Sequence, residues 1–384
     1  MMGGERPRDL PIKADKLPQD GSGVVRAHHV PPLNHDLVTV AQLGEFNAII
    51  DVRSPSEFAL DHVPGAINCP VLDDEERARI GTLYVQVSSF SAKKAGAALV
   101  ARNIARHIEQ HFADKPKSWR PLVYCWRGGQ RSAAMTHVLR QIGWDARRLS
   151  GGYKAFRHLV RADLEVLTAR FNYRVICGLT GSGKSALLGQ LEHQGAQVLD
   201  LEKLASHRGS LLGGLPDVQQ PSQKMFESQL WHLLGKMDVS RPVYVESESQ
   251  RIGALLLPEP LVAGMRQGHC ISLESPIEVR VLGLLRDYPH WTRSGRLDEI
   301  LDCLVILHGR GRIQEWKSCA AAGDWTTFVR RLLEEHYDPA YTKSIASHYL
   351  QLAAARRLNI TTGSDSDFER AARELLRPEL ALQA

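Results

Sequence analysis

The sequence predicts an α/β protein made of two α/β domains and a helical C-terminal part. Three short apolar runs, residues 48–52, 121–124 and 173–177, have the length and composition of strands in a parallel sheet. The last two each lead into a glycine-containing loop and then into a helix-prone segment. With 384 residues, the chain is long enough for two domains that each bury a core.

We predict four segments along the chain. Residues 1–33 are rich in Pro, Gly, Asp and Lys without a sustained period, which is typical of a mobile tail. Residues 34–155 form the first α/β domain, and residues 156–171 form a helical connector. Residues 172–384 form the second α/β domain with its helical C-terminal extension.

Composition excludes several classes of protein. A hydrophobic content of 43% and a charged content of 24% are those of a soluble globular protein. No apolar run approaches the roughly 20 residues that span a bilayer, and the N-terminus lacks a secretory signal, so we expect a cytoplasmic protein. The net charge of +5 permits a nucleic-acid partner without requiring one. The six cysteines are scattered with no C-x-x-C pair, so neither a disulfide framework nor a zinc site is indicated.

Residues 125–132, which read CWRGGQRS, are the strongest candidate for covalent chemistry. They lie between the apolar run that ends at Tyr124 and a helix-prone run, so we expect Cys125 at a strand-to-helix turn. The N–H groups at a helix N-terminus stabilise a thiolate, and Arg127 and Arg131 add positive charge. An inert buried thiol is the usual state of a single cysteine, but two glycines and two arginines in this loop favour a nucleophile.

Further residues are predicted around this nucleophile. Asp51 and Arg53 leave the end of a central strand, where α/β sheets place functional groups, although an ion pair that tethers loops fits them too. For Glu57 and His62 we favour the tethering role, and Cys69 is expected in the core. The predicted catalytic residues are Cys125 and Arg131, and the predicted substrate loop consists of Trp126, Arg127, Gly128, Gly129, Gln130 and Ser132 with Asp51 and Arg53.

Several stretches resemble the rhodanese family of sulfur transferases. They are residues 51–53, 57–58, 62–68 and 149–153, together with Pro70, Tyr124 and Cys125. The resemblance implies a rhodanese-like α/β domain. The sequence departs from the family in one respect, since five residues separate Cys125 from Arg131, which is the spacing of cysteine-dependent phosphatases and one residue more than in typical rhodaneses. The wider loop suits a tetrahedral oxyanion, so we expect a phosphate ester or a chalcogen-bearing phosphate as substrate.

A second motif, G-x-x-x-x-G-K-S at residues 178–185, follows a strand-like run and precedes a helix-prone run, as a phosphate-binding P-loop requires. Its glycines let backbone N–H groups face a phosphate chain, Lys184 neutralises the phosphates, and the Ser185 hydroxyl is a candidate ligand for Mg²⁺. We therefore predict a P-loop NTPase-like second domain. The predicted phosphate-binding residues are Gly178, Thr180, Gly181, Ser182, Gly183, Lys184 and Ser185.

Other candidate sites in the second half have two interpretations each. Glu246 and Glu248 follow an apolar run, and each fits either a Walker B carboxylate or a solvated turn residue. Asp200 and Glu202 are rival metal or acceptor ligands. Basic and aromatic residues are interleaved at residues 290–296 and 309–317, which suits RNA but is more common on a solvated helix face.

The combination of the two domains resembles the bacterial tRNA 2-selenouridine synthases. The stretches that carry this resemblance are residues 125–132, 151–154, 178–185, 199–202, 207–210, 220–223 and 251–253. It implies a transferase that replaces sulfur by selenium at C2 of wobble 2-thiouridine in tRNA, with selenophosphate as donor. The local chemistry is compatible with a Cys125 thiolate that takes selenium from selenophosphate as a perselenide. The resemblance also implies selenophosphate synthase as the source of the donor, an S-geranylated intermediate made from geranyl diphosphate, and no tightly bound cofactor.

The sequence leaves the ligand of the P-loop open. We favour the diphosphate of geranyl diphosphate over ATP, GTP or the tRNA backbone. Leu211, Leu212, Leu215 and residues 254–257 fit either a prenyl pocket or the core, and core packing is the more common role. Two other functions agree with the motifs: a cysteine-dependent phosphatase fused to a nucleotide kinase, and a non-catalytic tRNA-binding module. Tyr124 counts against the phosphatase, since phosphatases usually have His there. The sequence does not indicate an oligomeric state.

Overall fold

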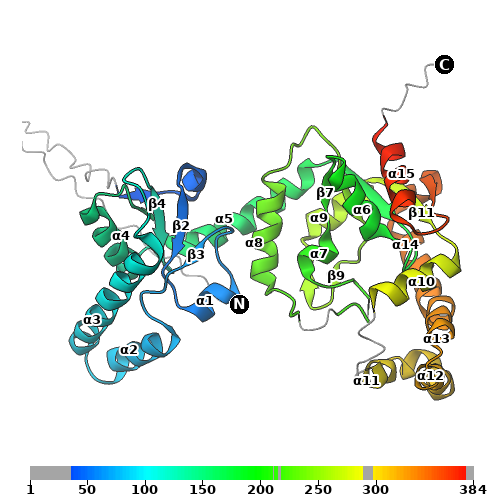
Figure 1. Ribbon diagram of the computed structural model, residues 1–384, viewed down its shortest axis with the longest axis horizontal. Coiled ribbons are helices and arrows are strands. Elements are labelled where there is room, and N and C mark those ends of the chain that lie inside the picture. Colours follow the sequence, from blue (N-terminus) through cyan, green and yellow to red (C-terminus); the bar gives the residue numbers. More distant parts are fainter. Residues whose placement is uncertain (1–35, 211, 215–217, 289–296, 378–384) are drawn as a thin grey trace, which may run out of the picture. The chain divides into compact units, whose positions relative to one another are not determined.

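The computed structural model describes residues 36–210, 212–214, 218–288 and 297–377. The predicted tail, residues 1–33, lies outside the described residues, as do Leu211, Leu215 and residues 290–296. In the described part, helices pack around two separate five-stranded sheets, each of them wholly parallel (Figure 1). This arrangement confirms the predicted α/β class.

The first sheet places Cys125 directly after its central strand. In spatial order its strands are β1 (Leu37–Val38), β5 (Arg147–Leu149), β4 (Pro121–Tyr124), β2 (Ala48–Asp51) and β3 (Ile67–Asn68). Every residue of β4 is buried, as expected for a strand with neighbours on both edges. Asp51 is in register with Tyr124, so the loops that follow β2 and β4 leave the same edge of the sheet side by side.

Side chains along β4 alternate between two cores. Val123 and Cys125 join the core that includes residues of α3 and α4. Leu122 and Tyr124 join the core that includes residues of α5. The helices of this part are η1 (Val40–Glu45), α1 (Pro55–Leu60), α2 (Asp74–Gln86), α3 (Ser89–His107), η2 (Ile108–Phe112), α4 (Gln130–Ile142) and α5 (Gly152–Leu167). The thiol of Cys125 therefore lies on the α4 side of the sheet.

Helix α5 leads from the first sheet to the second. It ends at Leu167, and a short turn, η3 (Thr168–Arg170), precedes the first strand of the second sheet. The helix contacts α8 (Gln223–Leu234), where the Trp231 indole N–H donates to the Asp163 carboxylate at 2.9 Å. A helix thus occupies much of the predicted connector, while the domain boundaries themselves stay predictions.

The second sheet is built in the same way around β6. In spatial order its strands are β12 (Arg356–Asn359), β11 (His269–Glu274), β6 (Tyr173–Cys177), β8 (Val243–Glu246) and β7 (Gln197–Leu199). Its companions are α6 (Lys184–His193), α7 (Leu201–Ala205), α9 (Glu259–Gln267), α15 (Asp365–Leu376) and the hairpin of β9 (Arg251–Ile252) and β10 (Leu255–Leu256). The parallel order brings the carboxyl ends of β6, β8 and β7 to one edge, where open α/β sheets bind ligands.

The helical C-terminal part has a core of its own. Its helices are α10 (Ile277–Asp287), α11 (Leu297–Asp302), α12 (Val305–Ala321), α13 (Trp325–Leu332), η4 (Leu333–Tyr337), α14 (Asp338–His348) and η5 (Leu350–Ala354). None of the described helices has the length and apolar character needed to cross a membrane.

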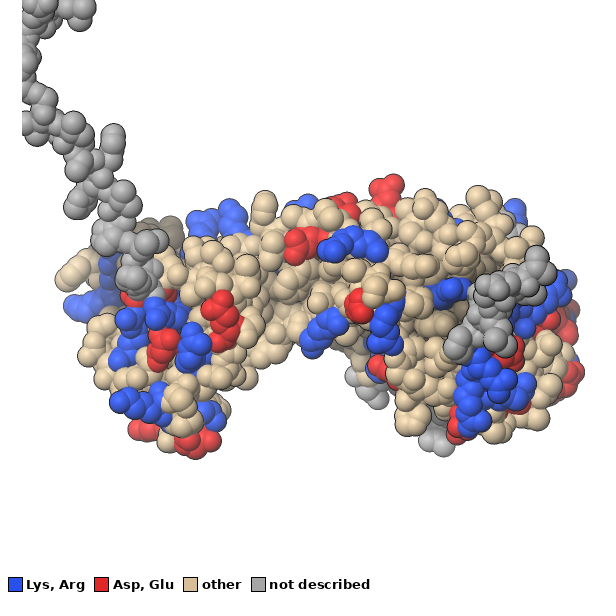
Figure 2. Space-filling view, turned by 90° about the horizontal axis from the view of Figure 1, so that it is seen from above, with Lys and Arg blue, Asp and Glu red and all other residues tan. Residues whose placement is uncertain are grey.

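Burial decides two of the open interpretations. Trp316 is fully buried and its indole N–H donates to Glu335, so residues 309–317 do not form the base-stacking face considered above. Leu255 and Leu257 belong to the core, which matches the core-packing interpretation, while Leu256 between them is exposed. On the face shown in Figure 2, basic and acidic side chains are interspersed, in line with the small net charge.

A buried ion pair holds the loop that follows β2. Asp51 and Arg53 are 0% and 1% exposed, and Arg53 Nη2 lies 2.5 Å from Asp51 Oδ2. The same guanidinium donates to the Asp61 carbonyl at 2.6 Å and lies 4.0 Å from the centre of the Tyr153 ring. These contacts match the tethering interpretation of Asp51 and Arg53 rather than a contact with substrate.

Replacing one partner of this pair leaves the other charge buried and unpaired. We expect Asp51→Ala to lower the free energy of unfolding by about 3–5 kcal/mol. Urea unfolding followed by circular dichroism measures the change. The control is Asp114→Ala, which removes an exposed ion pair with Lys115 and is expected to cost less than about 1 kcal/mol. Equal unfolding curves for the two variants would contradict the assigned role.

Candidate functional site

Cys125 lies between the end of β4 and the start of α4. Its side chain is buried, and its Sγ is 3.3 Å from the Ser132 hydroxyl in the first turn of α4. The helix begins at Gln130 with Gly129 as its N-cap. The backbone N–H groups of a first helical turn lack intrahelical partners and carry the positive end of the helix dipole. The predicted strand-to-helix placement is confirmed, and it suits both an anionic sulfur and a phosphate-like group.

Arg131 is held beside the loop by an acidic residue of α1. Its Nη1 lies 2.9 Å from Glu57 Oε2, and Arg77 approaches the same carboxylate at 3.2 Å. Burial opposes ionisation of Glu57, but the hydrogen bond from Arg131 and the charges of both arginines hold its pKa below the usual value. Glu57 therefore fits the tethering role, and it presets the position of the Arg131 guanidinium.

The backbone of residues 152–154 holds the Cys125 loop in place through hydrogen bonds. The Tyr153 N–H donates to the Cys125 carbonyl at 2.9 Å, and the Lys154 N–H donates to the Trp126 carbonyl at 3.0 Å. Gly152 has a φ of +57°, and a Cβ there would overlap the Cys125 carbonyl and lie 2.5 Å from the Gly128 nitrogen. Only glycine fits this position, which explains why a glycine directly precedes Tyr153.

The substitution Gly152→Ala tests whether close packing at this glycine holds the Cys125 loop in place. We expect it to destabilise the fold by more than the roughly 1–3 kcal/mol that left-handed backbone costs a non-glycine residue, because its methyl group also clashes with the loop. Chemical unfolding measures this cost. Gly44→Ala is the control, since Gly44 has open space around it and is expected to cost much less. A cost for Gly152→Ala no larger than that of the control would overturn the account.

The P-loop occupies the equivalent place in the second sheet. It follows β6, the central strand, and α6 begins at Lys184. The Lys184 ammonium donates to the Gly178 carbonyl at 3.0 Å and lies 5.0 Å from the centre of the Tyr341 ring. The strand, loop and helix thus have the arrangement in which P-loop N–H groups and the lysine receive phosphates.

Strand order decides which acids face the P-loop. The Ser185 hydroxyl donates to Glu202 Oε2 at 3.0 Å, and the Glu202 N–H donates to Glu246 Oε1 at 2.8 Å. Asp200 instead caps α7 by accepting from the Lys203 N–H. The other oxygen of Glu246, Oε2, is buried with no hydrogen-bond partner among the described residues.

These oxygens bear on the candidate Mg²⁺ site. Among the described residues, no three His, Cys, Asp or Glu side chains gather as metal ligands. Mg²⁺ at a phosphate site needs only one or two protein oxygens, because phosphates and waters complete its shell. Ser185 and Glu202 fit that requirement, whereas Asp200 is already engaged as a helix cap.

The acidic cluster predicts a pH dependence of stability. Burial, and then the charge of Glu202, raise the pKa of Glu248 to about 8, and burial also raises the pKa of Glu202 and Glu246. The folded state therefore holds protons that the unfolded state has lost, so stability falls as pH rises from about 5 to 8. Urea unfolding across this range, without Mg²⁺, measures the decline. Glu248→Gln should make the free energy of unfolding depend less steeply on pH, whereas Glu192→Gln, at an exposed position, should leave this dependence unchanged. The same pH dependence in both variants would contradict the prediction.

The P-loop, Asp200, Glu202 and Glu248 line a cleft of about 1050 Å³. Arg208, in the loop after α7, lies in this cleft with its guanidinium 4.5 Å from the centre of the Tyr288 ring. In the sequence, residues 207–210 stand out only as one of the stretches that carry the family resemblance, and no signal singles out Arg208. The structure brings its positive charge to the same cleft as Lys184.

Two family models match the parts of the chain that contain the loops. A rhodanese-like domain matches residues 38–159, and the tRNA 2-selenouridine synthase AAA domain matches residues 171–299. The tRNA 2-selenouridine synthase of Nitrosomonas europaea is 38% identical over 281 residues, which cover 72% of this chain and 72% of the relative. This chain belongs to the tRNA 2-selenouridine synthase family. The synthase of Nitrosomonas eutropha is 36% identical over 289 residues, 74% of each chain.

Membership of the tRNA 2-selenouridine synthase family confirms the resemblance drawn from the motifs. Each matched domain contains one of the two loops, with Cys125 in the first and Lys184 in the second. Among solved structures, a rhodanese-related protein from Thermoplasma volcanium is similar over 32% of this chain and 89% of its own, with 18% identity and a TM-score of 0.21. The roles of individual residues stay predictions.

Proposed function

We propose that this protein acts on tRNA as a 2-selenouridine synthase that replaces sulfur by selenium at C2 of wobble 2-thiouridine through an S-geranylated intermediate. One observation carries the proposal: a member of this family pairs a cysteine loop at the start of α4 with a phosphate loop at the start of α6. The proposed substrates are tRNA, selenophosphate and geranyl diphosphate, with selenophosphate synthase as the source of the selenium donor. Such substrates would place the reaction in the cytoplasm.

The first proposed step is geranyl transfer at the P-loop. The C2 sulfur of 2-thiouridine attacks C1 of geranyl diphosphate, a C–S bond forms, the C–O bond breaks, and the N3 proton is lost. The N–H groups of the loop and Lys184 would stabilise the departing diphosphate. If Mg²⁺ binds, Ser185 and Glu202 would hold it, and it would neutralise charge on the diphosphate. A displacement of this kind needs no nucleotide hydrolysis, which favours a diphosphate ligand over ATP or GTP.

Redox balance determines how selenium enters the base. Attack of a thiolate on the selenium of selenophosphate would leave the electron pair of the Se–P bond on phosphorus, giving phosphite rather than phosphate. The perselenide expected from the sequence therefore needs an oxidant that these substrates do not supply. Attack by the selenium of selenophosphate on C2 is redox-neutral: a C–Se bond forms, the C–S bond breaks, and geranylthiolate leaves.

Cys125 would then remove the phosphoryl group that selenium carries. Its thiolate attacks phosphorus, the Se–P bond breaks, 2-selenouridine is released, and water hydrolyses the cysteinyl phosphate. The five residues between Cys125 and Arg131, and the Ser132 hydroxyl 3.3 Å from Sγ, support this role. The first N–H groups of α4 and the Arg131 guanidinium would hold the phosphoryl oxygens.

Mass spectrometry of nucleosides tests these assignments. The protein is incubated with 2-thiouridine tRNA, geranyl diphosphate and selenophosphate. We expect Cys125→Ser to keep geranylation and to lower 2-selenouridine on the order of 100-fold or more, because it loses the nucleophile. Lys184→Ala should lower both products, because it removes the positive charge that neutralises the departing diphosphate in the first step. Cys303→Ser and Lys236→Ala are surface controls and should behave as wild type.

The intermediates distinguish the alternatives. If a nucleoside that contains both selenium and phosphorus accumulates with Cys125→Ser, the result supports removal of the phosphoryl group by Cys125. If that variant forms as much 2-selenouridine as wild type, this role of Cys125 is refuted. If wild type leaves the tRNA untouched with every combination of donors, the synthase proposal fails. Release of phosphate from an aryl phosphate would then favour a cysteine-dependent phosphatase.

A further inference from the structure

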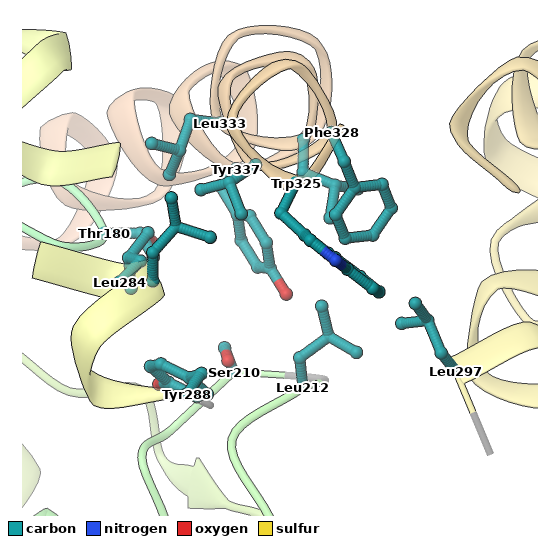
Figure 3. Close-up of a pocket in the computed structure, with 13 residues that line it drawn as sticks. Thr180, Ser210, Leu212, Leu284, Tyr288, Leu297, Trp325, Phe328, Leu333 and Tyr337 are labelled. Atoms are coloured by element: carbon teal, nitrogen blue, oxygen red, sulfur yellow. The ribbon is translucent and has the colours of Figure 1, made fainter. Parts of the chain in front are cut away.

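An apolar pocket lies beside the P-loop (Figure 3). Its walls come from α10, α13, η4 and the loop that carries Ser210 and Leu212. Leucine and aromatic side chains dominate the lining, including Leu284, Trp325 and Phe328. None of the thirteen described residues that line it is Asp, Glu, Lys, Arg or His. The pocket thus contrasts sharply with the charged cleft next to it.

The pocket and the phosphate site are continuous. Thr180 and Ser210 line both the pocket and the P-loop cleft. At Gly181, where φ is +79°, a Cβ would lie 3.0 Å from Leu284 Cδ1, so the P-loop backbone packs directly on the pocket wall. In Figure 3, Thr180 and Leu297 lie on opposite sides of the pocket with Trp325 between them. The site therefore runs from a phosphate-binding end to an apolar end.

This shape selects the chemistry of the ligand. A molecule that fills both parts has a phosphate head and an apolar body. A nucleobase presents several hydrogen-bonding atoms on its edges, and burying them against leucine and aromatic side chains is costly. The polar lining residues Thr180 and Ser210 lie at the P-loop end, and the Tyr337 hydroxyl forms a hydrogen bond with the Ser210 side chain. An alkyl or isoprenoid chain matches the rest of the wall.

We propose that this pocket holds the isoprenoid chain of an allylic diphosphate whose diphosphate lies on the P-loop, and that Trp325 limits the length of that chain. The proposal rests on the geranyl transfer proposed above and assigns its specificity to named residues. Trp325 begins α13 and stands edge-on to Phe328, with ring centres 5.8 Å apart and planes at 89°. Two packed rings form a firm wall across the pocket.

The size of the pocket sets a limit on the chain. Its volume is about 60 Å³, well below the volume of about 150 Å³ of a protein cavity that binds benzene. The pocket therefore admits only the last few carbons of a chain whose head is held at the P-loop. A chain longer by one isoprene unit would meet the indole of Trp325.

A donor series tests the proposal. Geranyl and farnesyl diphosphates are compared as donors to 2-thiouridine tRNA, using wild type, Trp325→Ala and Val329→Trp, and binding of inorganic diphosphate is measured by calorimetry. We expect Trp325→Ala to raise the farnesyl-to-geranyl ratio of kcat/KM on the order of tenfold or more. Val329→Trp, which narrows the pocket, should weaken geranyl transfer on the order of tenfold. Both variants should bind inorganic diphosphate as wild type does. Ile306→Ala, at a position 94% exposed, is the control.

The outcomes separate this proposal from the one on which it rests. If wild type transfers geranyl but the donor ratio is unchanged in both pocket variants, the pocket assignment is wrong and geranyl transfer stands. If wild type transfers no geranyl group with any donor, both proposals fall. Tighter binding of ATP or GTP than of geranyl diphosphate, weakened by Val329→Trp, would assign the pocket to a nucleobase. A variant that loses inorganic diphosphate binding is misfolded, and Leu333→Ala then replaces Trp325→Ala as the enlarging change.

Discussion

Both candidate sites depend on a helix that follows the central strand of a wholly parallel sheet after one short loop. In such a sheet the strands run the same way, so the loops after them gather at one edge. The helix that follows adds unpaired N–H groups and the positive end of its dipole. Cys125 before α4 and the P-loop before α6 are two uses of this one arrangement. It suits a reaction in which the leaving groups are phosphate and diphosphate.

The two sites differ in how their surroundings balance charge. Around Cys125, two buried or half-buried cations have acidic partners: Arg131 pairs with Glu57, and Arg53 pairs with Asp51. These pairs fix the loop before any substrate binds. Beside the P-loop, by contrast, carboxylates collect without enough cations, and burial raises the pKa of Glu246 well above its usual value. Glu246 therefore keeps its proton at a pH at which an exposed glutamate has lost it.

The chemistry of the proposed substrates constrains the proposed mechanism as strongly as the geometry does. Selenium bound to phosphorus is already reduced, so it can act as a nucleophile and needs no electron transfer. What remains after its transfer is a phosphoryl group, and a loop with five residues between cysteine and arginine is suited to remove it. The departure from the typical rhodanese spacing thereby gains a chemical reason.

Local patterns determined much of this protein from sequence alone. Strand-like runs followed by glycine-containing loops placed Cys125 and Lys184 correctly, because hydrophobic periodicity and turn residues act over a few neighbouring positions. The two motifs and their spacing pointed to the family. The sequence could not choose between Asp200 and Glu202, since that choice depends on which side chain caps α7 and which faces Ser185.

Only the tertiary structure decided the remaining contacts. Trp316 reads as part of a basic and aromatic stretch, yet it is buried, because a neighbouring helix covers it. The apolar pocket unites Thr180, Leu212, Leu284 and Trp325, which are far apart in the chain and share no motif. Apolar residues on α10 and α13 signal only that some face is buried. Which face meets which partner is set by packing across the whole second domain, and packing is not encoded locally.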